Sequence, residues 1–132
     1  MNISKVIPDS FYPKLIQDYI SEGLKKNRLI EWDYSMSELH EKSKVRNFQS
    51  RKVLHEALTS QNKDIELSSP SQQNLGSLLN ESTFTICTGH QLCIYGGPAY
   101  FFSKIIDTIN LARKMNAAYP KNHHVPVFWM AS

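Results

Sequence analysis

The chain has 132 residues, of which 41% are hydrophobic, and a formal net charge of +3 with its five histidines neutral. A chain of this length can form one modest domain. Its basic residues are scattered, so nucleic-acid binding is not indicated, and no apolar run approaches the ~20 residues that cross a bilayer. The first residues lack the apolar centre of a signal peptide, so we expect a soluble, cytoplasmic protein without a membrane partner.

The first eighty residues carry the signals of helix starts and stops. An apolar face over residues 11–20 follows a Pro-Asp-Ser stretch at residues 8–10, and Gly23 is the expected stop. We expect residues 1–82 to form a helical segment that packs on the core. Its later helices should begin at Ser35, where Glu38 completes a capping box, at Ser50, and at Ser69 with Pro70, and the last should end near Asn80.

The remaining residues read as a strand, a helix and a second strand. Residues 83–87 are rich in β-branched and aromatic side chains, and Gly89 is a point where the chain can turn. Residues 98–118 place apolar side chains at three- and four-residue steps, with Pro98 at the first helical position, and residues 125–130 form another apolar run. These lengths predict a βαβ unit with parallel strands. Because only two residues follow the second run, ending at Ser132, we read the chain as the N-terminal piece of a longer protein.

Ligands of open α/β sheets bind beyond the carboxyl ends of the strands, so the candidate site is the loop over residues 88–97. The loop begins with a polar turn and ends at a helix start whose macrodipole favours anions. Its glycines match neither a dinucleotide fingerprint nor a P-loop. The residues expected to contact substrate there are Thr88, Gly89, Gly96, Gly97 and Tyr100.

Three side chains near this loop are candidates for chemistry. His90 can bond a phosphate oxygen or move a proton, although a turn histidine bonded to backbone is the alternative. Gln91 can donate and accept through one amide group. Lys104, two turns into the helix, can reach back with its ammonium group, and a solvated lysine is its alternative.

The other conspicuous residues carry structural interpretations. We expect Cys87 to be a small core residue, Cys93 to be a bystander thiol in the loop, and Trp129 to pack in the core. His123 and His124 are adjacent and lack a third ligand nearby, so we expect a turn there and no metal site.

With these residues in place, TGHQLCIYGGPAYFFSKIIDTINLARK followed by VPVFWMAS resembles the N-terminal core of the bacillithiol biosynthesis cysteine-adding enzymes. The family's pattern is a Thr-Gly-Gln/His-Gln turn, a Gly-Pro helix start, a Tyr and a Lys in that helix, and a later Val-Pro-Val-Phe/Tyr-Trp strand. The departures from it are Cys93, Gly96 and Ala99.

The resemblance implies an α/β fold in which N-terminal helices precede the first βαβ unit, residues 83–132, of a Rossmann-like parallel sheet similar to that of class I aminoacyl-tRNA synthetases. It implies a ligase that joins L-cysteine to glucosaminyl-malate through an amide bond, with ATP as the expected source of activation. We expect His90, Gln91 and Lys104 to act in catalysis. The piece by itself should be inactive.

Two other functions stay open. The first is another ATP-using nucleotidyl transferase or ligase with the same core and a different amine acceptor. The second is a non-catalytic helical binding module whose glycine-rich turn is only structural. Assembly into a homo-oligomer is left open in each case.

Overall fold

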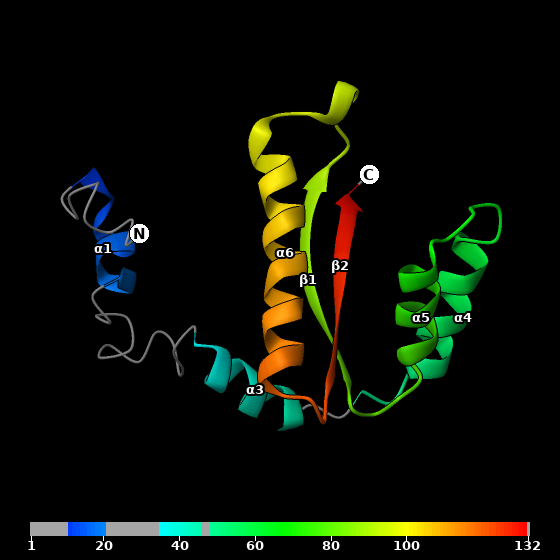
Figure 1. Cartoon of the computed structure of the whole chain (residues 1–132). Helices are drawn as coiled ribbons and strands as arrows, with labels where there is room; N and C mark the ends of the chain where they lie inside the picture. The colour runs from blue at the N-terminus through cyan, green and yellow to red at the C-terminus, as the bar shows by residue number, and fades with distance from the viewer. Residues whose placement is uncertain (1–10, 21–34, 46–47, 132) are drawn as a thin grey trace. The chain divides into compact units, whose positions relative to one another are not determined.

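The computed structural model describes residues 11–20, 35–45 and 48–131 (Figure 1). The chain divides into two compact units, residues 1–46 and residues 47–132, and each is described by itself. The stretch at residues 8–10 and the helix stop predicted at Gly23 lie outside the described residues.

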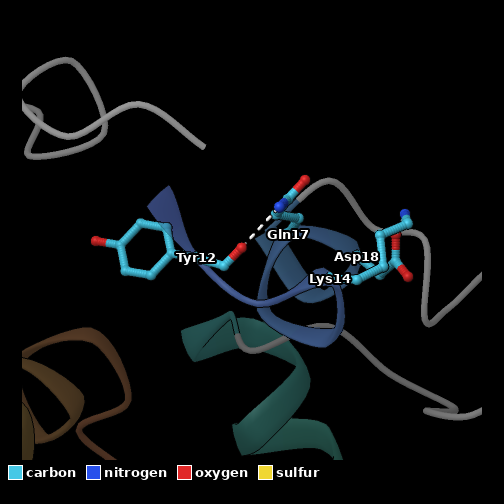
Figure 2. Close-up of polar contacts among 4 residues, drawn as sticks. All are labelled: Tyr12, Lys14, Gln17 and Asp18. Atoms are coloured by element: carbon cyan, nitrogen blue, oxygen red, sulfur yellow. Dashed lines mark hydrogen bonds and ion pairs between the residues drawn. The ribbon is translucent and has the colours of Figure 1, made fainter. Parts of the chain in front are cut away.

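The first unit contains two described helices, α1 (Lys14–Ile20) and α3 (Met36–Val45). In α1 the Gln17 side chain donates to the Tyr12 carbonyl at 2.7 Å, and Lys14 pairs with Asp18 one turn later (Figure 2). The Ser35 hydroxyl accepts a hydrogen bond from the Glu38 amide at 3.2 Å, which confirms the helix start predicted at Ser35.

The second unit begins with a pair of helices, α4 (Arg51–Gln61) and α5 (Ser69–Ser77). Both start where the sequence predicts, but the Ser50 side chain makes no cap hydrogen bond, and α5 ends at Ser77 instead of near Asn80. Arg51 holds the segment after α5, because its guanidinium donates to the carbonyls of Leu78 at 3.2 Å and Glu81 at 3.3 Å.

The sheet of this unit has two parallel strands, β1 (Thr83–Gln91) and β2 (His123–Ala131). Their arrows point the same way in Figure 1, and their register runs from Thr83 opposite His123 to Gln91 opposite Ala131. The predicted βαβ unit and the α/β fold class are confirmed. β1 is longer than predicted at its carboxyl end and β2 at both ends, because cross-strand pairing holds added residues whose own β signal is weak.

The turn predicted at Gly89 is wrong. Gly89 pairs with Trp129 inside the sheet, and a Cβ at Gly89 would lie 2.7 Å from the Trp129 carbonyl oxygen. Glycine is needed there because the two backbones approach closely, not because the chain turns. The turn comes later, in the short helix η3 (Ile94–Gly96) and at Gly97.

The crossover helix α6 (Ala99–Ala118) packs on one face of the sheet, as Figure 1 shows, and buries Thr108, Ala112 and Met115. Pro98 is the N-cap residue of α6, whereas the sequence predicted it as the first helical residue. No helix in the described part of the chain is long and apolar enough to span a membrane.

Asn116 joins the end of α6 to the start of β2. Its side-chain oxygen accepts from the His124 amide at 2.6 Å, and its nitrogen donates to the His124 carbonyl at 3.2 Å. His123 and His124 therefore lie in β2, and the turn predicted for them is wrong.

The face of the sheet opposite α6 is open toward the carboxyl ends of the strands within the described residues. Cys87 is exposed, and Trp129 is 67% exposed, so the core positions predicted for both are wrong. The physical reason is strand alternation, which points both side chains away from α6. Sequence patterning cannot tell which face of a strand receives a helix.

Candidate functional site

The candidate site lies where β1 ends and α6 begins. A parallel βαβ unit brings the carboxyl end of its first strand and the amino end of its crossover helix to the same edge of the sheet. His90 is the second-last residue of β1, and Tyr100 and Lys104 lie in the first two turns of α6. The βαβ topology therefore places these three residues within reach of one another.

His90 is held at both ring nitrogens. Nδ1 lies 2.8 Å from the Gln91 carbonyl oxygen, and Nε2 lies 2.7 Å from the Tyr100 hydroxyl. Because a carbonyl oxygen only accepts, Nδ1 carries the proton and a neutral ring accepts the Tyr100 hydroxyl hydrogen at Nε2. The ring also packs against the Tyr100 and Phe101 rings, with centroids 5.2 and 5.7 Å away. His90 thus presents a basic nitrogen in a fixed orientation.

Lys104 supplies a cation beside this ring pair. Its Nζ donates to the Gly89 carbonyl at 3.2 Å and lies 5.7 Å from the centroid of the Tyr100 ring. The side chain is half-buried. An ammonium group has three donors, so two remain for an anionic ligand after the bond to Gly89.

The amino end of α6 adds two backbone donors. Pro98 makes no side-chain cap bond, and the Phe101 amide donates to the Pro98 carbonyl at 2.9 Å. By helix geometry the amides of Ala99 and Tyr100 have no partner within the helix, and they lie at the positive end of its dipole. Together with Lys104, this end of α6 suits a carboxylate or a phosphate.

Gly96 and Gly97 serve to form the turn before α6. Gly96 and Gly97 have φ values of +83° and +70°, which side-chain-bearing residues rarely adopt. The Gly97 amide donates to the Ile94 carbonyl at 3.2 Å, so the turn itself uses it. A Cβ on Gly97 would lie 2.6 Å from the Cys93 Cβ, and therefore Gly97 also makes room for Cys93.

Cys93 is a site residue that the sequence analysis missed. Its Sγ lies 3.4 Å from His90 Nδ1 and 3.5 Å from the Gln91 carbonyl oxygen. The contact is local, because both residues precede the left-handed turn at residues 95–97. The signal in the sequence was the three-residue spacing of His90 and Cys93 just before a glycine pair.

The structure brings together Gly89, His90, Tyr100 and Lys104. Thr88 is half-buried beside them on the α6 face of β1, opposite Phe128. Gln91 is exposed, and strand alternation directs its side chain to the other face from His90, although its carbonyl oxygen contacts the ring. The catalytic role of Gln91 therefore stays a prediction that its position does not favour.

A separate groove of about 230 Å³ lies between α5, α6 and the middle of β2. Its walls are mostly apolar and contain no titratable side chain, so the His90 end of the sheet is the better candidate for chemistry. The residues that line the groove are Ser71, Asn74, Ile105, Thr108, Ile109, Pro126, Val127 and Phe128.

Comparison with known families shows which family this chain belongs to. A family model described as "Bacillithiol biosynthesis BshC, N-terminal Rossmann-like domain" matches residues 1–132. The chain belongs to the BshC family. The expected family resemblance and the Rossmann-like fold are both confirmed, and the β1–α6–β2 unit lies within the N-terminal domain of that family.

Individual BshC relatives show how much of the family the chain covers. Proteins named "Putative cysteine ligase BshC" from Flavobacterium psychrophilum and Flavobacterium johnsoniae are each 39% identical over 92% of the chain, and one from Christiangramia forsetii is 37% identical over 93%. In all three the match covers 24% of the relative's length. The chain therefore spans about a quarter of these BshC proteins.

Proposed function

We propose that this chain forms the substrate-orienting part of a cytoplasmic cysteine ligase of bacillithiol biosynthesis. In the proposed reaction, the amine of glucosaminyl-malate attacks the activated carboxyl group of L-cysteine, an amide bond forms, and the activating group leaves. The family membership and the relatives' shared name support a ligase. The observation that carries the proposal for this chain is the convergence of His90, Tyr100 and Lys104 at the carboxyl end of a parallel strand.

His90 suits the proton transfer that amide formation requires. An attacking amine must lose a proton, and a neutral imidazole with its Nδ1 proton held by a carbonyl presents Nε2 as the base. The Gln91 carbonyl fixes this tautomer at 2.8 Å. The Tyr100 hydroxyl, 2.7 Å from Nε2, marks where a substrate donor would replace it.

Lys104 and the start of α6 suit the negative charge of the acceptor substrate. The malate part of glucosaminyl-malate is an anion at neutral pH. The two remaining Lys104 donors and the amides of Ala99 and Tyr100 form a cationic, donor-rich end of the helix for such a group.

ATP is part of the proposal as the source of activation. When bound, it supplies the leaving group that makes the cysteine carboxyl reactive. The same donors at the start of α6 fit a phosphate group as well as a carboxylate, because both are oxygen anions of similar bonding geometry. The chain's own contribution is to hold and orient the anion.

The test uses the full-length protein, L-cysteine, glucosaminyl-malate and ATP, with bacillithiol measured by thiol labelling and mass spectrometry. His90→Ala should lower the rate at least about a hundredfold, the lower range for loss of an acid–base group. The matched control is His123→Gln, because His123 begins β2 at the opposite end of the same sheet and bonds Asn74. That variant should keep the normal rate.

Two results would contradict the proposal. If the wild-type protein joins cysteine or another amino acid to a different amine, the alternative of a nucleotidyl transferase or ligase with another acceptor replaces it. If the wild-type protein forms bacillithiol and His90→Ala does so at the normal rate, His90 is not part of the site.

A further inference from the structure

The His90 ring is held by one hydrogen bond at each nitrogen. Nδ1 bonds the Gln91 carbonyl at 2.8 Å and Nε2 bonds the Tyr100 hydroxyl at 2.7 Å. Hydrogen bonds at imidazole nitrogens act in the plane of the ring, so they direct the nitrogens but do little to stop the ring from tilting about the line between them. A packing contact is needed to fix the tilt.

The bond to Tyr100 is also the one that a substrate would replace. Tyr100 is 52% exposed, and its hydroxyl occupies the position proposed for a substrate donor at Nε2. With a substrate in that position, the bond to the Gln91 carbonyl is the one of these two that still holds the ring. The orientation of His90 in the reacting complex therefore depends on how the ring is packed.

Phe101, the third residue of α6, contacts one aromatic side chain from each strand. Its ring centroid lies 5.7 Å from that of His90 in β1 and 5.0 Å from that of Phe128 in β2, and the rings meet at 79° and 64°. Such steeply inclined arrangements are favourable for aromatic pairs. Phe101 and Phe128 are both half-buried. Phe128 thus limits the movement of Phe101, and Phe101 limits the tilt of His90.

We propose that Phe101, supported by Phe128, is a positioning residue that fixes the tilt of the His90 ring and so aims Nε2 at the attacking amine; this inference rests on the proposed function. Phe101 has no titratable group and acts through His90. A base that tilts away from the amine slows the proton transfer, although the substrate still binds. The expected signature of losing Phe101 is a fall in kcat with little change in KM.

The first experiment measures bacillithiol formation by the full-length protein at varied concentrations of glucosaminyl-malate. Phe101→Leu should lower kcat on the order of tenfold and change KM by less than about twofold. Phe101→Tyr keeps an aromatic ring at this position and should recover most of the rate. The matched control is Phe102→Leu, because Phe102 is the next residue of α6 and is 52% exposed. That variant should keep the normal kcat.

A normal kcat in Phe101→Leu, or equal losses in Phe101→Leu and Phe102→Leu, would overturn the positioning role. The support from Phe128 is tested by a double substitution. Phe128→Leu should lower kcat in the wild type and have little further effect in Phe101→Leu, because it acts through Phe101. Equal losses in the two backgrounds would remove Phe128 from the proposal.

The second experiment needs no substrate, so its result is distinct from a failure to form bacillithiol. In full-length protein labelled with 15N-histidine, NMR follows the exchange of the His90 Nδ1 proton with water, and the signal is identified by its loss in His90→Ala. Phe101→Leu should speed this exchange about tenfold, because a tilting ring opens its bond to the Gln91 carbonyl more often.

Phe102→Leu should leave the exchange unchanged. The His124 amide, which carries the same label and bonds Asn116 at the other end of the sheet, reports whether each variant keeps its fold. Absence of the His90 signal in the wild type, or wild-type exchange in folded Phe101→Leu, would overturn the positioning role.

Discussion

Gly89 shows how one residue without a side chain sets the geometry of this site. Its carbonyl oxygen accepts from Lys104, and its Cα faces Trp129 of β2 so closely that a Cβ would lie 2.7 Å from the Trp129 carbonyl oxygen. A real Cβ cannot occupy that position, so any larger residue must push the strands apart. The bond that orients Lys104 would move with the strand.

Gly89→Ala should therefore destabilise the protein by about 2 kcal/mol, the usual cost of overpacking against backbone. The measurement is the midpoint of urea unfolding followed by circular dichroism. The matched control is Gly76→Ala in α5, where nothing lies within 4 Å of the new Cβ. This control should stabilise by about 0.5–1 kcal/mol, because alanine is the better helix former. Equal effects of the two changes would refute the close approach at Gly89.

At the scale of single residues, the sequence indicates which residues lie near the candidate site but not which contacts their side chains make. His90, Tyr100 and Lys104 could be placed together because a strand end and a helix start must meet in a βαβ unit. The contact of Cys93 with His90 could not be predicted, since the three-residue spacing does not determine how the ring and the sulfur are oriented at the end of β1. The close approach of Gly89 to Trp129 could not be predicted either, because it depends on how β2 pairs with β1.

At the scale of elements, the order of helices and strands followed from local signals, whereas their ends depended on contacts between elements. Residues 88–91 extend β1 because β2 pairs with them, although the sequence reads as a turn. Ser50 marks the start of α4 without making a cap bond. The exposure of Cys87 and Trp129 is likewise decided by which face α6 covers.

The hydrogen bonds of Asn116 in α6 to His124 in β2 can be tested by a single substitution. Asn116 makes bonds of 2.6 and 3.2 Å to the backbone of His124, and its oxygen also lies 3.0 Å from His124 Nδ1. Asn116→Ala should destabilise by about 2 kcal/mol, because His124 is 2% exposed and its backbone groups would lose their partners.

Asn110→Ala on the exposed side of the same helix is the control and should be neutral or slightly stabilising. Thermal unfolding of the two variants side by side measures the difference. A loss at Asn116 no larger than that at Asn110 would mean that the His124 backbone does not depend on this side chain.

At the scale of the whole molecule, the described residues form a two-stranded parallel sheet with a helix on one face and the candidate site at the carboxyl ends of its strands. The chain spans about a quarter of the BshC proteins it matches, so the proposed ligase activity belongs to the full-length protein. The contribution that we propose for this part is an oriented histidine, a lysine and a helix start that together favour an anion.

The most direct measurement of that claim is the affinity of the full-length protein for glucosaminyl-malate, determined by isothermal titration calorimetry. Lys104→Ala should weaken binding about tenfold, because it removes charge-assisted hydrogen bonds to the anion. Lys114→Ala, on an exposed position of the same helix, should bind as the wild type does. Unchanged affinity in Lys104→Ala, or an equal loss in both variants, would contradict an anion site at the carboxyl end of β1.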